Sequence, residues 1–208
     1  MSARDSILDR LRRAERTGVV PETRTAAVPV GPVESRSKDA MLERFAGELA
    51  ALGVAVYSEP SDEAVRARVS ALVGGRSVLR WDSERLPYGV GELLVDAATG
   101  SSPRAAQAAA EFGVTGADGA IAETGSLALL SGEGKPRAAS LLPPTHIAVV
   151  RRSDLQASLG EFFSNRAADI AAAACCTFIT GPSRTADIEL TLTLGVHGPG
   201  VVIVVVGP

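Results

Sequence analysis

Val201-Val202-Ile203-Val204-Val205-Val206 is an unbroken run of six β-branched residues. It is far shorter than the roughly 18 apolar residues that a membrane span requires, and it has the length of a strand buried on both faces. Strands of this kind are typical of parallel sheets that helices cover. The run therefore predicts an α/β fold.

Helix-like and strand-like segments alternate along the chain from residue 39 onward. The spacing predicts helices over 39–52, 61–74, 103–112 and 154–175, the last with a break at Gly160. It predicts strands over 54–57, 78–81, 93–95, 114–117, 119–123, 127–130, 146–150, 177–180 and 201–206. This alternation indicates βαβ units and a mostly parallel sheet. The short glycine-punctuated strands in the middle of the chain indicate some antiparallel pairing.

The first 37 residues are set apart from this alternating body. A helix is predicted over about 3–16, where Ile7, Leu8, Leu11 and Ala14 recur at helical spacing. Residues 18–37 are rich in proline and glycine, which is typical of a linker or extended arm. We therefore expect an N-terminal helix and arm over 1–37 and a single α/β domain over 38–208. The helix either packs on the body or docks on a partner chain.

The composition excludes several classes of protein. The chain has 208 residues, 46% of them apolar, and a net charge of −3, which argues against a disordered chain and against non-specific nucleic-acid binding. Its first residues lack the apolar core of a signal peptide, and no run is long enough to span a membrane. Cys175 and Cys176 are the only cysteines, so we expect no disulfide framework and a cytoplasmic location. Two cysteines are also too few for an iron–sulfur cluster with four thiolate ligands.

The first candidate site lies in the segment Gly116-Ala-Asp-Gly-Ala-Ile-Ala-Glu-Thr-Gly-Ser126. Glu123 follows an apolar run, and a partly buried carboxylate is suited to acid–base or nucleophilic catalysis. Glycines that admit a ligand to the backbone and hydroxyl side chains surround it. These candidate ligand-binding residues are Gly116, Thr124, Gly125 and Ser126. The alternative is a tight turn in which backbone N–H groups satisfy Glu123.

A glycine-rich turn, Ser131-Gly-Glu-Gly-Lys-Pro136, contains the candidate anion-binding residue Lys135. It is not a nucleotide-binding phosphate loop, because Pro136 stands where Ser or Thr must follow the lysine and Leu129 replaces the first glycine. The turn is either a solvated hairpin or a mobile loop whose cation contacts an anionic ligand.

Residues 180–189 give the strongest local indication of an anion site. A strand ends there, a Gly-Pro-Ser turn follows, and a short helix is expected to begin near Thr185. Free N–H groups at the start of a helix bind anions, and nearby hydroxyl and guanidinium groups support them. The candidate binding residues are Gly181, Ser183, Arg184 and Thr185, and Asp187 is a candidate for acid–base catalysis. Ordinary N-capping is the alternative.

The two histidines are further candidates. His146 lies at the entrance of a predicted strand and is a candidate catalytic residue, and His197 lies in the loop 195–199 as a candidate ligand contact. Each has a structural alternative. Two distant histidines with scattered acids do not form the convergent set of three or four ligands that a metal needs. There is also no dinucleotide-binding glycine motif, so we expect no metal and no redox cofactor in this chain.

Four segments, in this order, resemble the LUD (lactate utilisation domain) family: 116–126, 140–146, 181–188 and 195–199. The resemblance covers nearly the whole chain. It implies a three-layer α/β/α sandwich like that of ribose-5-phosphate isomerase, glucosamine-phosphate deaminase and the CoA transferases.

The resemblance also implies a function. This function is the oxidation of L-lactate to pyruvate beside iron–sulfur lactate-utilisation proteins of the A and B types, with a small carboxylate or phosphorylated compound as ligand. The B type carries cluster-binding cysteines that this chain lacks, so the resemblance implies no iron–sulfur cluster here.

Two other functions stay open. Class I CoA transferases use a glutamate followed by Asn-Gly, and Glu123-Thr124-Gly125 is similar except that threonine replaces asparagine. An independent isomerase or acyl transferase that uses Glu123 is therefore one alternative. A purely structural subunit, with the N-terminal helix as its docking arm, is the other.

Overall fold

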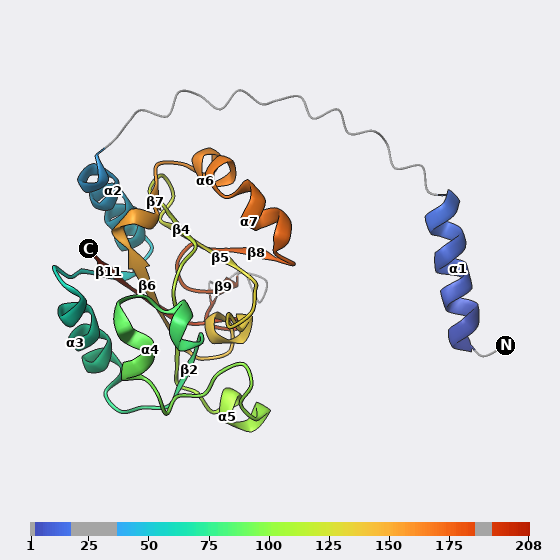
Figure 1. Cartoon of the computed structure of the whole chain (residues 1–208), viewed down its shortest axis with the longest axis horizontal. Helices are drawn as coiled ribbons and strands as arrows, with labels where there is room; N and C mark the ends of the chain where they lie inside the picture. Colours follow the sequence, from blue (N-terminus) through green and yellow to red (C-terminus); the bar gives the residue numbers. More distant parts are fainter. Residues whose placement is uncertain (1–2, 18–36, 186–192) are drawn as a thin grey trace. The chain divides into compact units, whose positions relative to one another are not determined.

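The structure is a computed structural model that describes residues 3–17, 37–185 and 193–208 (Figure 1). The helix α1 forms a unit of its own and is described separately from the α/β body. Within this helix, Ile7 and Leu11 are 57% and 61% exposed. None of the helices in the described ranges is long and apolar enough to cross a membrane.

The helices of the described chain are α1 (Ala3–Thr17), α2 (Lys38–Ala51), α3 (Asp62–Val73), α4 (Val90–Leu93), α5 (Arg104–Ala108), α6 (Leu159–Asn165) and α7 (Ala167–Ala172). The strands are β1 (Ala55–Ser58), β2 (Val78–Arg80), β3 (Phe112–Thr115), β4 (Gly119–Ile121), β5 (Ser126–Leu130), β6 (Thr145–Arg151), β7 (Leu155–Gln156), β8 (Cys176–Ile179), β9 (Arg184–Thr185), β10 (Thr193–Leu194) and β11 (Val201–Gly207).

A five-stranded parallel sheet forms the core, in the order β1-β11-β6-β3-β2. The valine-rich strand β11 lies between β1 and β6, with Ile203 beside Ile147, and Val204 and Val205 are fully buried. The helix α3 packs on β11, and α2 packs on β1 (Figure 1). The predicted α/β class with a mostly parallel sheet is confirmed.

A second sheet has the order β7-β4-β5-β8, in which β5 runs antiparallel to both β4 and β8. The expected antiparallel pairing in the middle of the chain is therefore present. A short antiparallel pair, β9 and β10, flanks residues 186–192, which lie outside the described part.

Some predicted elements differ from the structure. Residues 93–95, predicted as a strand, belong to the end of α4 and the turn after it, and α5 ends at Ala108 because Phe112 already belongs to the buried strand β3. The predicted helix 154–175 contains the short strand β7 and breaks at Arg166 rather than at Gly160. In each case pairing with a neighbouring strand or packing overrides the local helical pattern.

A close contact at Gly113 of β3 joins the parallel sheet to the 3₁₀ turn that precedes β6. A Cβ at Gly113 would lie 1.7 Å from the carbonyl oxygen of Ala139, in the 3₁₀ turn η3 (Arg137–Ser140). Glycine is therefore required at this position for η3 to reach the sheet. This contact places Arg137 and Ser140 beside the second sheet, where they line the candidate site described below.

Candidate functional site in a groove beside strand β8

Three hollows that share lining residues lie near the edge of the second sheet formed by β8, and residues of β8 line two of them. A hollow of about 390 Å³ and one of about 240 Å³ flank a narrow waist of about 10 Å³. The waist shares Ser131 and Lys135 with the larger hollow, and it shares Ser140 and Thr177 with the smaller one. We call this row of three hollows the β8 groove.

Lys135 is fixed in the groove by two neighbours. Its Nζ lies 2.5 Å from Oδ1 of Asp118 and 5.1 Å from the centre of the Trp81 ring, and both members of the ion pair are less than one-fifth exposed. Oδ2 of Asp118 accepts the backbone N–H of Leu130 at 2.8 Å. Lys135 is therefore held at one corner of the groove, while Gly132 and Glu133 at the tip of the turn are exposed.

Gly116 supports this corner from behind. A Cβ at Gly116 would lie 3.3 Å from the Trp81 ring and 3.1 Å from the carbonyl oxygen of Arg85. The glycine thus makes room for the ring beneath Lys135.

The far wall of the larger hollow carries a second set of charges. Arg166 donates to Asp169 at 3.1 Å and lies 3.6 Å from Asp154, and both Arg166 and Asp169 line the hollow. Like Lys135, Arg166 therefore has a carboxylate partner already.

Arg137 differs from these two cations. It lines the waist and is exposed, and no carboxylate of residues 37–185 or 193–208 lies within ion-pair distance of it. Sequence reasoning missed Arg137, because a single exposed arginine carries no signal until the fold places it beside Lys135. Its guanidinium group is free to form charge-assisted hydrogen bonds with an anionic ligand.

The smaller hollow is lined by hydroxyl-bearing residues and by apolar side chains, among them Leu141, Phe178 and Ile179. Among its lining residues are Thr180, Gly181, Ser183 and His197, and Gly181 has the positive φ of +80° that glycine tolerates. Ser183 is held by backbone hydrogen bonds from its N–H to Pro199 and from Gly195 to its carbonyl oxygen. The structure thus brings together three predicted binding residues, Gly181, Ser183 and His197, at one end of the groove.

A chain of hydroxyl groups connects Thr124 and Ser126 to this end. Thr124 Oγ1 lies 2.8 Å from Ser126 Oγ, which lies 2.7 Å from Thr180 Oγ1. Gly125, at φ +65°, lets this segment lie against α2, since a Cβ there would be 3.0 Å from Leu49 N. Neither Thr124 nor Ser126 itself lines the groove, so their link to a ligand runs through Thr180.

Glu123 lies outside the groove. Its Oε1 accepts the N–H of Leu159, the first residue of α6, at 3.3 Å, and its backbone carbonyl accepts from Arg44 at 3.4 Å. A carboxylate at the start of a helix stabilises the helix through its dipole. This geometry gives Glu123 a structural role at α6, and no contact described here favours the enzyme alternative that uses it.

His146 is fully buried in the parallel sheet, on β6. Its Nε2 lies 2.8 Å from Oγ1 of Thr115, and its Nδ1 is the one buried side-chain polar atom in the described ranges without a hydrogen-bond partner. Burial lowers the pKa of His146 to about 4, so the ring is neutral at pH 7. Its sheet neighbour Val202 lines the smaller hollow, but His146 itself does not.

The predicted helix start near Thr185 is replaced by strand β9. Arg184 and Thr185 pair with β10, and Arg184 Nη2 donates to the carbonyl oxygen of Leu52, just after α2, at 2.7 Å. Pairing with β10 takes the backbone groups that a helix start would leave free. Asp187 lies outside the described residues.

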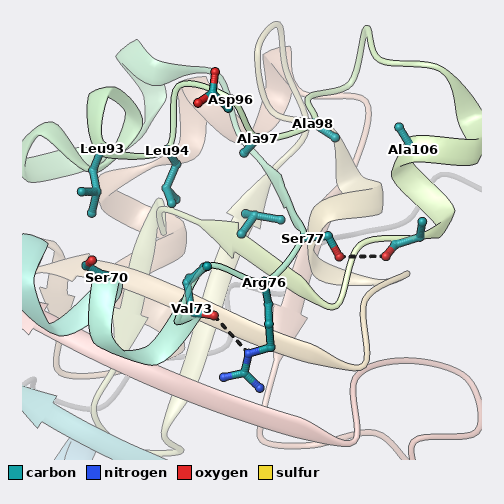
Figure 2. Close-up of a pocket in the computed structure, with 13 residues that line it drawn as sticks. Ser70, Val73, Arg76, Ser77, Leu93, Leu94, Asp96, Ala97, Ala98 and Ala106 are labelled. Atoms are coloured by element: carbon teal, nitrogen blue, oxygen red, sulfur yellow. Dashed lines mark hydrogen bonds between the residues drawn. The ribbon is translucent and has the colours of Figure 1, made fainter.

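A larger hollow of about 720 Å³ lies at the β2 edge of the parallel sheet (Figure 2). None of the residues predicted from the sequence as site residues lines it.

The parallel sheet and the mixed second sheet define an α/β protein, and the β8 groove carries hydroxyl and cationic side chains. The family model of the LUD domain matches residues 42–206, which is most of the chain. The chain belongs to the LUD domain family.

Two relatives agree with this membership, and one solved structure has a similar fold. The chain is 31% identical to lactate utilization protein C of Shouchella clausii, over 94% of this chain and 93% of the relative. It is 30% identical to the protein of the same name from a Geobacillus strain, over 93% and 89% of the two chains. The fold is similar to the crystal structure of a DUF162 family protein from Deinococcus radiodurans, with a TM-score of 0.68 and 24% identity over 83% of this chain and 99% of that one.

Proposed function

We propose that this chain acts in lactate utilisation by binding a small carboxylate, such as L-lactate or pyruvate, in the β8 groove. The observation that supports this most directly is the convergence of Lys135, Arg137, Ser140 and Thr177 on the narrow waist. A carboxylate needs donors of this kind, and hydrogen bonds to charged groups contribute about 1.5–3 kcal/mol each.

In this proposal the waist binds the carboxylate group, and the smaller hollow binds the rest of the ligand. The waist has room for about one water-sized group, so it takes a carboxylate oxygen, and the rest of the ligand extends into the hollow of about 240 Å³. There the hydroxyl groups of Thr180 and Ser183 and the ring of His197 are within the lining and select for a hydroxyl or keto group. We propose lactate or pyruvate as the carboxylate because the relatives are named for lactate utilisation.

In this proposal, partner proteins accept the electrons that lactate oxidation releases. Oxidation of L-lactate to pyruvate releases two electrons and two protons, and the chain's two adjacent cysteines are too few to ligate a four-thiolate cluster. We therefore place the iron–sulfur centres in A-type and B-type partners and assign this chain to the ligand.

A complementation experiment tests the proposal. A strain without this gene is given the wild type, Arg137→Gln, or Arg104→Gln, an exposed arginine on α5 away from the groove. We expect the wild type and Arg104→Gln to restore growth on L-lactate as sole carbon source and Arg137→Gln to fail. Normal growth of the deletion strain on L-lactate would contradict the proposal.

A further inference from the structure

The hollow beside β2 has a shape and lining unlike those of the β8 groove. Its volume is about 720 Å³, and its walls come from α3, the start of β2, the end of α4 and α5. In Figure 2 the side chains of Leu93 and Leu94 point from α4 toward the helix that carries Ser70 and Val73. Pockets of about 300–1,000 Å³ at junctions between elements commonly take small organic ligands.

Two polar side chains in these walls, Arg76 and Ser77, already have partners within the protein. Arg76 donates from Nε to the carbonyl oxygen of Val73 at 3.0 Å, and its guanidinium carbon lies 4.4 Å from the centre of the Phe112 ring. Ser77 Oγ donates to the carbonyl oxygen of Ala109 at 2.9 Å. The carboxylate of Asp96 points away from the gap between Leu93 and Val73 (Figure 2). Arg76 is the only cation in the lining, and these contacts hold it in place, while the other polar side chains, Ser70 and Asp96, are exposed.

The walls are also held in place before any ligand binds. Ala98 forms a parallel bridge with Leu79 at the free edge of β2, through backbone hydrogen bonds of 2.9 Å to Val78 and from Arg80. The buried side chain of Arg80 donates to the carbonyl oxygen of Leu94 at 2.8 Å, which fixes the end of α4 above the hollow. A preformed apolar pocket lowers the ordering cost of binding.

We propose that this hollow binds the uncharged apolar part of a small molecule, an alkyl chain or a hydrocarbon ring, with any polar end directed toward Ser70 and Asp96 at the rim. Leu93 is 40% exposed, so a ligand would cover apolar surface that is now in contact with water. The proposal is independent of the carboxylate site, because the two sites share no lining residue.

A homologous series of neutral ligands tests whether the hollow binds apolar groups. Full-length protein is titrated with the neutral dye Nile red, which is then displaced by 1-hexanol, 1-octanol and 1-decanol. We expect saturable dye binding and an affinity that rises about fourfold for each added methylene group. The corresponding alkyl carboxylates should bind more weakly than the alcohols, because the one cation of the lining, Arg76, is already held by two carbonyl oxygens and the Phe112 ring.

Two variants locate the binding in this hollow. Leu93→Asp places a charge among the apolar walls and should weaken dye binding at least tenfold, whereas Val95→Asp, at a residue 69% exposed and outside the lining, should leave it unchanged. Ala106→Trp, at an exposed wall position, should block binding without disturbing the core. The proposal is overturned by the absence of saturable binding, by equal effects of the two aspartate variants, or by tighter binding of the carboxylates than of the alcohols.

Discussion

The ammonium group of Lys135 lies between the carboxylate of Asp118, at 2.5 Å, and the ring of Trp81, 5.1 Å from its centre. Asp118 follows β3, Trp81 follows β2, and Lys135 closes the turn after β5, so the contact ties the two sheets together. The same contact sets one side of the groove waist, with Arg137 on its lining. The stability of this corner and the affinity of the groove are therefore linked.

Replacing Asp118 by asparagine should destabilise the protein by about 2 kcal/mol, because Lys135 then lies mostly buried without its counter-charge. The asparagine side-chain oxygen still accepts the N–H of Leu130, which keeps the turn's backbone satisfied. Urea denaturation of the variant and the wild type measures the difference. Glu133→Gln, at an exposed position in the same turn, is the control and should change stability by less than about 0.5 kcal/mol. Equal stability of Asp118→Asn and the wild type would show that the ion pair is not structural.

His146 should make the protein less stable as the pH falls from 7 to 5. Its folded pKa of about 4 lies below the ordinary value of 6.5, so the unfolded chain binds the proton more tightly throughout this interval. Stability is therefore present above about pH 6.5 and is lost as the pH falls toward 4. Linkage gives a loss of about 2 kcal/mol between pH 7 and pH 5 from this group alone.

A comparison of variants separates the pH dependence caused by His146 from that of other titratable groups. Burial raises the pKa of Asp154, which acts in the opposite direction, so the wild-type slope alone is not diagnostic. Denaturation of His146→Gln at both pH values should show a smaller loss than the wild type, by about 2 kcal/mol. An unchanged slope in His146→Gln would contradict the assignment.

Two glycine-to-alanine substitutions should change the free energy of unfolding in opposite directions. Gly113→Ala would place a Cβ 1.7 Å from the carbonyl oxygen of Ala139, so η3 must move off the sheet, at a cost of at least about 3 kcal/mol. Gly47→Ala lies in the interior of α2 with no atom within 4 Å of the new Cβ, and it should stabilise by about 0.5–1 kcal/mol. Denaturation midpoints of the two variants check both signs. A mild effect of Gly113→Ala would mean that η3 does not rest on the sheet as described.

Glu123→Gln should leave carboxylate binding unchanged. The glutamine oxygen still accepts the N–H of Leu159, so the helix α6 keeps its contact and stability should fall by less than about 1 kcal/mol. Calorimetric titration with L-lactate measures the affinity of the variant against that of the wild type. A loss of binding or turnover in this variant alone would instead favour the enzyme that uses Glu123.

The strands and most helices could be predicted from sequence because their patterns are local: Val201–Val206 is apolar throughout, and Ser61 and Gly74 mark the two ends of α3. The short strand β7 and the early end of α5 could not, since only pairing with distant strands decides them. The site likewise contains residues that local motifs predict and residues that only the fold brings together. Gly181, Ser183, Lys135 and His197 carry local motif signals and line the groove, while Arg137 and Thr177 acquire a role only when η3 and β8 come together.

The central claim is that the β8 groove binds a small carboxylate through Arg137, and Trp81 allows it to be measured without a label. Trp81 is the only tryptophan in the chain and lines the waist, so its fluorescence should report a ligand bound there. Titration with L-lactate should give a saturable change in Trp81 emission, with an affinity at least tenfold weaker in Arg137→Gln and unchanged in Arg104→Gln. No saturable change with L-lactate or pyruvate, or equal affinities in all three proteins, would contradict the account.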